Sequence, residues 1–408
     1  MLRVMKTTSL PPFPEAIENW WWSQAISKWS DSSEEKLLNS IRREIVEQSD
    51  RFNKTRSFES SSYGSRDLSI LSYGNFFFPR MWQSMAYALS EAYSFRGWKV
   101  PTKGPLRILD LGSGTGASGL ACLFHLRKWA IENPISLEAW DYSSKSLGTL
   151  KSLHRSCPSL WPNSKVITKR KDLRYPFGKE DSLKFDLVLM CFSMNEILEK
   201  EEGEYQLGWL NQVTQYLKPN GFLIILEPAE SQTCNNLQEN SRILTESSSQ
   251  LYKHAPYFNN LPCPLIVNKS KYYSHEVRRI FPTQTMQKIN APLRLEIREI
   301  KFGISILGKP KALSFPGKHS PCRLVSPIKK SKGVIFFVGI GADGQEYRYE
   351  FQRRDLTKEE TNDLLSLERG DVLRLGLGES GKDEKRIRIP STKDLQLLFA
   401  PRPGSETY

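Results

Sequence analysis

The glycine-rich turn at residues 112–116 constrains the fold of this chain more than any other feature. It follows a short apolar run, residues 108–111, and precedes residues 117–129, where apolar side chains recur at helical spacing. Such a short run is typical of a strand buried on both faces. Glycines let the backbone approach a ligand closely, and the first N–H groups of a helix have no partner within it. Strand, glycine turn and helix together predict an α/β unit with a ligand site at the turn.

The spacing of the glycines indicates which ligand that site binds. A dinucleotide-binding turn reads Gly-x-Gly-x-x-Gly, whereas this turn reads Asp-x-Gly-x-Gly-x-Gly. It resembles motif I of the class I methyltransferases, which use S-adenosylmethionine. In that family the acidic residue faces the cationic amino-acid end of the cofactor, and the glycine turn passes under it. The alternative is a tight turn in another α/β protein. The resemblance implies cofactor contacts from Asp110, Gly112, Ser113, Gly114 and Gly116.

Further cofactor contacts are predicted after the next strands. Asp141 ends the apolar run 135–140, where an acid can accept both ribose hydroxyls; the alternative is a helix N-cap. Asp172 follows a third short strand, 166–167, and methyltransferases often bind the adenine amino group with an acid there. The predicted contacts beyond the glycine turn are Asp141, Tyr142, Asp172, Leu173 and Cys191.

The candidate catalytic residues follow the fourth predicted strand, residues 185–190. This strand runs into residues 191–196, where the substrate side of such a fold lies. The D/N-P-P-Y/F sequence of amino-directed methyltransferases is missing there, and so is a cysteine pair for forming a carbon adduct. Asn195 and Glu196 are the polar side chains predicted to act there, Glu196 as a base, although both could equally open the next helix.

A second motif supports the same fold class. Residues 217–221, Leu-Lys-Pro-Asn-Gly, resemble the L-K-P-G-G turn before the fifth strand of class I methyltransferases. We therefore expect an α/β protein with a class I methyltransferase Rossmann-like sheet, an N-terminal helical region and a C-terminal β-rich appendage. The expected domains are residues 1–100 (helical), 101–310 (cofactor domain with an insertion, 229–292, that starts as a helix and ends in loops) and 311–408 (basic linker and β-rich domain).

The aromatic runs of the N-terminal region have two interpretations. Residues 20–22 are three tryptophans, and residues 76–78 are three phenylalanines that lead into a predicted helix ending near Tyr93. The simpler interpretation is the core of a helical cap. An RNA-stacking surface is the alternative, but stacking aromatics need exposed platforms. Residues 50–66, polar and rich in Ser and Arg, are predicted to form a loop.

The surplus of positive charge indicates a polyanionic partner. The net charge is +13, which favours nucleic acid or a membrane surface, unless the protein is simply basic. Residues 291–332 carry ten basic residues against two acids, and basic and aromatic residues interleave in 269–279. A solvated face is the alternative for both. The predicted RNA contacts are Lys271, Arg278, Arg279, Lys329, Lys330 and Lys332.

Composition and sequence patterns also lead to expectations about membrane spans, cellular location and disulfide bonds. The mean hydropathy of −0.47 and the lack of a long apolar run argue against a membrane span. The apolar stretch near the first residue is too short for a signal peptide, and Glu15 and Glu18 come early, so we expect a cytoplasmic protein. None of the six cysteines forms a C-x-x-C pair, and disulfides are not expected.

The order of short motifs along nearly the whole chain resembles one family. This is the methyltransferase-like family associated with the mitochondrial small ribosomal subunit, which has bacterial relatives. The resemblance implies binding to small-subunit ribosomal RNA and a role in ribosome assembly or translation, without assured methyl transfer. The motifs in order are Tyr73–Pro79, the glycine turn, Asn195-Glu196, Pro262–Leu265, Glu299–Phe302 and the basic-to-β tail.

Many members of that family carry an iron–sulfur cluster held by four cysteines. Those positions correspond here to Tyr257, Cys263, Tyr272 or Tyr273, and about Ile340. One thiol cannot hold a four-thiolate cluster. The remaining histidines and cysteines match no known metal spacing. We therefore predict no iron–sulfur cluster and assign no metal ligand, although His254, His275 and Cys322 could supply other ligands.

Three functions are compatible with these sequence features. The leading one is an S-adenosylmethionine-binding, methyltransferase-like protein acting on the small ribosomal subunit. The second is an RNA-binding assembly factor in which the cofactor stabilises the fold and no methyl group moves. The third, a small-molecule methyltransferase, is disfavoured by the basic segment and the appendage. The target nucleotide and the oligomeric state are not predicted.

Overall fold

The computed structural model describes most of the chain. Its described strands form a central mixed sheet of eight strands, a C-terminal sheet of nine strands and a separate pair of two strands. The predicted loop at 50–66 lies almost wholly outside the described residues. The described residues are 3–4, 9–50, 66–175, 183–198, 204–247, 250–293, 297–315, 321–376, 379–380, 385–393 and 395–404.

The central sheet has the order β5-β4-β3-β6-β7-β10-β8. Strands β5, β4, β3, β6 and β7 are parallel, whereas β10 runs antiparallel to β7. The order reverses beside β3, and in open α/β sheets ligands bind outside the carboxyl ends of the strands at such a point. The strands are β3 (Leu106–Leu111), β4 (Ile135–Asp141), β5 (Ser164–Arg170), β6 (Phe185–Cys191), β7 (Leu217–Pro228) and β10 (Glu299–Gly308).

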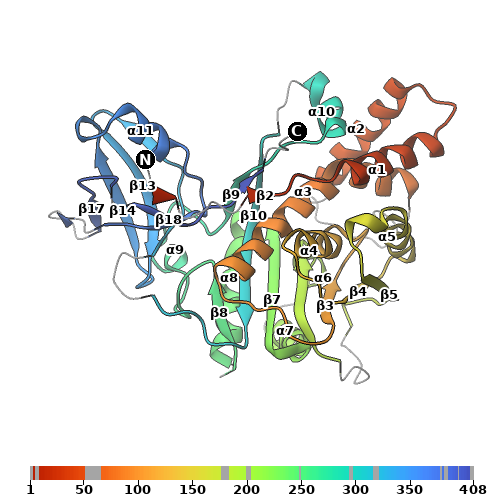
Figure 1. Cartoon of the computed structure of the whole chain (residues 1–408), viewed down its shortest axis with the longest axis horizontal. Helices are drawn as coiled ribbons and strands as arrows, with labels where there is room; N and C mark the ends of the chain where they lie inside the picture. Colours follow the sequence, from red (N-terminus) through yellow and green to blue (C-terminus); the bar gives the residue numbers. More distant parts are fainter. Residues whose placement is uncertain are drawn as a thin grey trace.

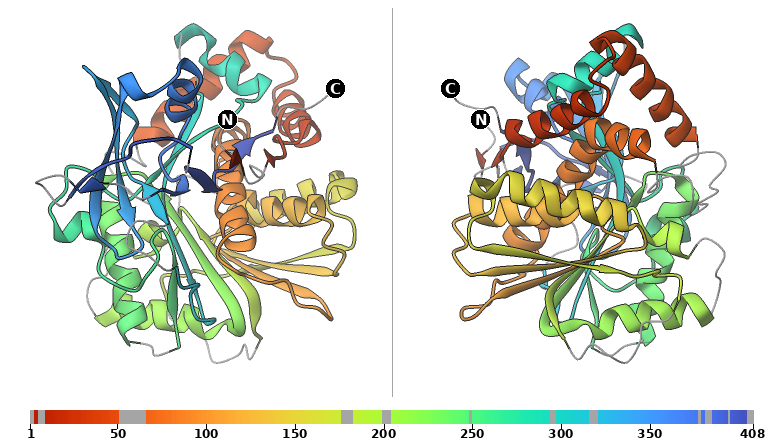
Figure 2. Two further views of the ribbon diagram at one scale, coloured as in Figure 1. Left: turned by 60° about the vertical axis from the view of Figure 1, so that its left-hand side comes forward. Right: turned by 90° about the vertical axis from the view of Figure 1, so that its right-hand side faces the viewer.

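Both faces of this sheet are buried because successive strand residues point to opposite sides. In β3, Ile108 packs into one hydrophobic cluster with side chains of α4 and α5, while Leu109 packs into a second cluster with those of α7 and α8. Figure 2 shows α4 and α5, in orange and yellow, along one side of the strands. The covering helices are α4 (Ala117–Lys128), α5 (Ser144–Ser156), α7 (Glu204–Gln215) and α8 (Ser231–Ser247). The predicted fold class, the Rossmann-like sheet of class I methyltransferases, is confirmed.

Three helices precede the sheet: α1 (Glu15–Lys28), α2 (Glu34–Asp50) and α3 (Asp67–Ser94). Phe76, Phe77 and Phe78 are buried, and so is Trp21. The core interpretation of these aromatic runs is confirmed, with Trp20 and Trp22 only partly buried. The triple phenylalanine lies inside α3 rather than ahead of a helix, because α3 already begins at Asp67 and continues through Pro79.

The insertion 229–292 completes the edge of the central sheet. Its strands β8 and β9 both pair with β10. The expectation that it ends in loops is wrong, since it ends in α10, whose apolar residues Met286 and Ile289 are buried. Its elements after α8 are β8 (Tyr252–Ala255), α9 (Pro264–Val267), β9 (Glu276–Arg279) and α10 (Gln284–Asn290).

The C-terminal sheet is built around the predicted hairpin of β13 and β14. Gly344, with φ of +77°, lies in its turn. The predicted basic linker is only partly correct, because β11 is a buried strand between β13 and β15. The strands are β11 (Cys322–Leu324), β12 (Lys329–Ser331), β13 (Val334–Gly341), β14 (Glu346–Gln352), β15 (Val372–Arg374), β16 (Glu379–Ser380), β17 (Arg386–Arg388) and β18 (Gln396–Phe399), with helix α11 (Lys358–Leu365) beside them.

The N-terminal region is not wholly helical, which corrects the sequence prediction. Strand β1 (Arg3–Val4) pairs with β18, and β2 (Ser9–Leu10) pairs with β19 (Arg402–Pro403). In Figure 1 the red N-terminal strand therefore lies among the blue C-terminal ones, while α1 and α2 lie on the other side of the molecule. Among the described residues, no helix is both long and apolar enough to cross a membrane.

Candidate functional site

The three glycines of the turn between β3 and α4 serve different purposes. All have positive φ, of +71°, +50° and +90° for Gly112, Gly114 and Gly116. A Cβ atom on Gly112 would lie 2.4 Å from the Cβ of Ser193, and one on Gly116 would lie 2.2 Å from Cδ1 of Leu150. A Cβ on Gly114 would meet no described atom within 4 Å. Packing therefore requires the outer glycines, whereas Gly114 borders open space.

Asp110 is buried where β3 approaches this turn. Its Oδ2 accepts hydrogen bonds from the Ser118 hydroxyl (2.7 Å) and the Gly119 N–H (2.9 Å). Its Oδ1 is buried and accepts no hydrogen bond from the described residues. Burial raises the pKa of Asp110 to about 7, although both hydrogen bonds oppose that shift. Within the described ranges, no positively charged group stabilises this carboxylate.

Asp141 connects the end of β4 to the glycine turn. Its two oxygens accept from the backbone N–H groups of Gly114 and Ser143, each at 2.8 Å. The N-cap alternative for Asp141 is wrong, because the side chain of Ser143 caps α5 by accepting from the N–H of Ser146 at 3.1 Å. Burial raises the pKa of Asp141. A ribose would reach this carboxylate only by sharing or replacing these backbone contacts.

The residues predicted to bind adenine lie beside Asp141. The N–H of Lys171 donates to the Asp141 carbonyl at 2.9 Å, which places 171–173 at the same strand ends. Asp172 accepts from Arg174 at 2.9 and 2.6 Å, and this pairing lowers its pKa. Leu173 is buried, and Tyr142 is 37% exposed. An adenine amino group would therefore compete with Arg174 for Asp172.

The backbone is strained where β6 ends. Phe192 has a φ of +59°, which is unusual for an aromatic residue, and its N–H donates to the Leu226 carbonyl at 2.7 Å. The Ser193 hydroxyl donates to the Leu111 carbonyl at 2.8 Å. Strain held in place by neighbouring strands is typical of functional sites. Sequence reasoning missed Phe192, because nothing in its neighbourhood signals a positive φ.

Glu227, near the end of β7, is the most notable residue that sequence reasoning missed. It is 0% exposed, and its Oε1 accepts from the N–H groups of Met194 (3.1 Å) and Asn195 (3.4 Å). Its Oε2 finds no hydrogen-bond partner within the described ranges. Burial raises its pKa to about 8, against those two hydrogen bonds. The sequence signal that could have identified Glu227 is an acidic residue near the end of an apolar strand, as for Asp110 and Asp141.

These groups lie together at the carboxyl ends of three neighbouring strands. Cys191 ends β6, between β3 and β7. Burial raises the pKa of its thiol, and the carboxylates of Asp110 and Glu227 raise it further, which reflects their proximity. Asn195 adds a buried Oδ1 for which the described residues offer no partner. Glu196 is half-buried and has further contacts, so its predicted role as a base stays a prediction.

The positions that correspond to the iron–sulfur ligands of the resembled family also come together. Tyr257, Cys263 and Ile340 share one hydrophobic cluster, against which Tyr272 packs. The Cys263 thiol lies 3.7 Å from the Tyr257 hydroxyl. An iron–sulfur cluster of this kind needs four thiolates, whereas these positions offer one thiol, two phenols and an alkyl side chain, so they do not fit it. No group of three or more His, Cys, Asp or Glu side chains suited to a metal occurs in the described part of the chain.

The predicted RNA contacts divide into exposed and buried residues. Lys271 and Lys329 lie 5.4 and 5.9 Å from the ring centre of Tyr272, although they come from distant segments. Lys330 and Lys332 are exposed nearby in sequence. Arg279 is exposed but pairs with Glu368 at 3.2 Å. The prediction for Arg278 is wrong, because its side chain is 1% exposed and cannot reach a phosphate on the surface.

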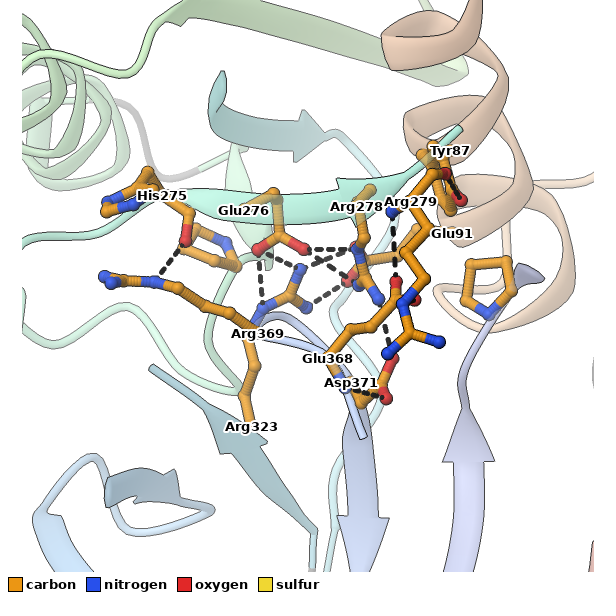
Figure 3. A network of polar contacts seen from close by, with 12 residues as sticks. Tyr87, Glu91, His275, Glu276, Arg278, Arg279, Arg323, Glu368, Arg369 and Asp371 are labelled. Atoms are coloured by element: carbon orange, nitrogen blue, oxygen red, sulfur yellow. Dashed lines mark hydrogen bonds and ion pairs between the residues drawn. The ribbon is translucent and has the colours of Figure 1, made fainter. Parts of the chain in front are cut away.

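Arg278 instead belongs to a buried ion-pair network that joins the central and C-terminal sheets (Figure 3). It pairs with Glu276 at 2.8 Å and Asp371 at 2.6 Å. Arg323 of β11 pairs with Glu91 of α3 at 2.7 Å and with Glu276 of β9 at 2.8 Å. These ion pairs connect four parts of the chain that are far apart in sequence, near residues 91, 276, 323 and 371.

Comparisons with known proteins show similarity to methyltransferases. No family model matches the chain. A curated relative, the mitochondrial citrate synthase-lysine N-methyltransferase of Danio rerio, is 28% identical over 125 residues, which cover 29% of this chain and 46% of the relative. The match thus spans just under half of that protein's length.

Solved structures resemble the chain only distantly. One, described as a class I S-adenosylmethionine-dependent methyltransferase of Listeria monocytogenes, has 13% identity and a TM-score of 0.39, covering 75% of this chain and 90% of its own. The methyltransferase domain of citrinin polyketide synthase has 13% identity and a TM-score of 0.33, with 74% and 80% covered. Because these TM-scores are low, the fold assignment rests on the order of the strands in the central sheet and on the residues at the strand ends.

Proposed function

We propose that this protein is an S-adenosylmethionine-dependent methyltransferase. The observation that carries the proposal is the cradle formed by the glycine turn: open space at Gly114, on a turn that directly follows the strand bearing the buried, incompletely paired carboxylate of Asp110. Buried polar atoms normally have hydrogen-bond partners, and exceptions need an explanation. A cofactor with a cationic amino-acid end and a ribose supplies one. The similarity to methyltransferases and the Rossmann-like sheet support the same general function.

The residues at the strand ends fit that cofactor. Asp110 would face its ammonium group, Gly114 would let the backbone approach, and Asp141 would accept its ribose hydroxyls. The Ser113 and Thr115 hydroxyls, buried on the turn and lacking partners among the described residues, offer further polar contacts. When bound, the cofactor supplies a methyl group already activated on a sulfonium. The task of the protein is then mainly to orient an acceptor for in-line attack and to exclude water.

The acceptor, in this proposal, belongs to the small ribosomal subunit, either as a methylated nucleotide or as a bound partner during assembly. Four lysines support it: Lys271, Lys329, Lys330 and Lys332 are exposed, and the first two flank the Tyr272 ring. Exposed cations that lie close together suit the phosphates of an RNA. The missing D/N-P-P-Y/F sequence keeps a non-catalytic assembly factor as the second candidate.

Calorimetry with S-adenosylmethionine tests cofactor binding directly. We expect the parent protein to bind and Gly114→Arg to lose binding, since the new side chain would occupy the cradle. Gly148→Arg is the matched control, because Gly148 is exposed on α5 and its Cβ would also meet nothing described within 4 Å. Circular dichroism would check that both variants fold. Equal affinity of a folded Gly114→Arg variant and the parent would rule out this site.

A further inference from the structure

We propose that the methyl acceptor is an amine and that Glu227 and Asn195 receive its N–H groups, with Glu227 taking the proton it loses. This inference rests on the proposed function and names the substrate class of the same site. It concerns residues beyond the glycine turn, at the ends of β6 and β7. It also replaces Glu196 as the candidate base.

The first argument is that Glu227 uses only half of its carboxylate to build the site. Its Oε1 holds the backbone N–H groups of Met194 and Asn195, and this fixes the loop after β6. Its Oε2, fully buried, accepts nothing from the residues described. A structural role alone would be served by a neutral side chain that costs less to bury. The second oxygen therefore points to a ligand that donates hydrogen.

The second argument is that Asn195 adds another acceptor at the same place. Its N–H bonds to Glu227, and its own side-chain Oδ1 is buried with no partner in the described ranges. Two acceptor atoms suit a ligand that donates at least two hydrogens. A primary amine does so, whereas a hydroxyl or thiol donates only one. The strained backbone of Phe192, just before this loop, is consistent with a site built for a ligand.

The third argument concerns the local charge. Asp110 on β3 and Glu227 on β7 lie on the strands to either side of β6, which Cys191 ends, and among the described residues no cation acts on the pKa of either carboxylate. An aliphatic amine arrives as a cation and would supply the missing positive charge, whereas the amino group of a nucleobase is uncharged, so the inference favours an amine on a protein of the subunit over one of its nucleotides. In the ligand-free protein burial raises the pKa of Glu227 to about 8, so the carboxylate, once it is deprotonated beside an entering ammonium, is a stronger base than an exposed glutamate. A general base works best when its pKa is near the working pH.

The chemical step balances with the groups named. The acceptor ammonium first gives one proton to Glu227 Oε2, which frees the nitrogen lone pair. That pair forms the new N–C bond to the methyl carbon, and the C–S bonding pair stays on sulfur as a neutral thioether. The product amine carries the positive charge that the sulfonium lost. No oxidant or further reactant is needed.

Sinefungin provides a test that needs no knowledge of the natural acceptor. In this analogue a carbon bearing an amine replaces the sulfonium and its methyl group, so the ammonium projects toward the acceptor side. We expect the parent protein to bind sinefungin at least about tenfold more tightly than S-adenosylhomocysteine, since a charge-assisted hydrogen bond contributes that much. Glu227→Gln should lose this preference while its affinity for S-adenosylhomocysteine stays within about twofold.

The outcomes separate the inference from the proposed function. If the parent binds neither ligand, the proposed function fails. If it binds S-adenosylhomocysteine but shows no preference for sinefungin, only the amine inference is overturned. Loss of the preference in Glu196→Gln, with retention in Glu227→Gln, would overturn it in favour of Glu196. If Glu227→Gln does not fold, Asn195→Ala tests the inference instead. The inference requires that this variant weakens the binding of sinefungin but not that of S-adenosylhomocysteine, and equal weakening or no change overturns it.

Discussion

Two buried polar regions of this protein contain the same kinds of side chain in opposite electrostatic states. At the strand ends, burial raises the pKa of Asp110 to about 7 and that of Glu227 to about 8. At the junction of the two sheets, burial also disfavours the charged form of Glu91, but Arg323 and Arg96 lower its pKa to about 2. The difference lies in the presence of arginines, not in the depth of burial.

This contrast distinguishes carboxylates that hold the fold together from carboxylates available to a ligand. In the network of Figure 3, guanidinium groups compensate the acids, and the charges connect α3, β9 and β11. At the strand ends, hydroxyl and backbone donors satisfy only part of each carboxylate. Strongly perturbed pKa values in a ligand-binding region are typical of functional sites.

Removing the central cation of the network should have the largest effect. Arg323→Ala leaves the buried carboxylates of Glu91 and Glu276 without a shared partner, and we expect it to lower the free energy of unfolding by about 3–5 kcal/mol. Arg386→Ala is the control: this arginine pairs with Glu350 in the same sheet, but its side chain is 54% exposed, and we expect a loss of about 0–1 kcal/mol. Urea unfolding measures both. Similar losses would show that the network is no more important than a surface pair.

A steric change in the network should have a smaller effect. A Cβ on Gly370, which has a φ of +98°, would lie 1.6 Å from Glu276 Oε2. We expect Gly370→Ala to cost about 1–3 kcal/mol more than Gly333→Ala. Gly333 also has positive φ, at +79°, but its Cβ would meet no described atom within 4 Å. Comparing the two variants therefore separates the steric clash with Glu276 from the strain of a positive φ. Equal thermal stability of the two variants would contradict the described packing.

The two regions should also respond to pH with opposite signs. The pKa of Glu227 is higher in the folded than in the unfolded protein, so the folded state binds more protons and stability falls as pH rises from about 4.5 toward 8. Glu227→Gln should flatten this decline in unfolding experiments between pH 5 and 8. The pKa of Glu91 is lowered, so its contribution is present above about pH 4.5 and is lost as pH falls toward 2. An unchanged pH profile in Glu227→Gln would show that this carboxylate is not held in its neutral form.

The smallest effect on stability is expected at the exposed lysines. Replacing Lys329, Lys330 and Lys332 together by Ala should change the free energy of unfolding by less than about 0.5 kcal/mol per site. It should weaken binding to small-subunit RNA and reduce its salt dependence by up to about one unit of slope per lost contact. Filter binding at several salt concentrations measures this, with S-adenosylmethionine affinity as the control. An unaltered slope would mean that these lysines form an ordinary solvated face.

Sequence patterns predicted the parts of the fold governed by local rules. The glycine turn, the parallel strands and the hairpin at Gly344 follow from apolar runs and turn chemistry. Patterns failed where the partner of a residue lies far away in sequence. Arg278 and Arg323 belong to basic segments, yet both are buried, because Asp371 pairs with Arg278 from 93 residues away and Glu91 and Glu276 pair with Arg323 from earlier parts of the chain. Charge density along a sequence does not distinguish a surface cation from one with distant acidic partners.

The candidate site was predictable to a similar extent. Asp110 was found because it precedes the glycine turn in a recognisable motif, and Asp141 because it ends the next strand, β4. Glu227 also ends a strand, but only the structure reveals that its Oε1 holds the backbone after β6 while Oε2 stays available. Phe192 gave no signal at all, because its positive φ results from the pairing of neighbouring strands.

The pairing of β1 with β18 and of β2 with β19 has a consequence for how the chain is made. Residues 3–4 are synthesised early, yet their partners are residues 396–397. At a synthesis rate of roughly 5–20 residues per second, the first strands wait about 20–80 s for those partners. The central sheet, whose strands all precede residue 309, has its full sequence well before then. The two terminal strand pairs therefore close only after the central sheet has its full sequence, and a chain interrupted before residue 402 would leave Leu10 without its strand partner.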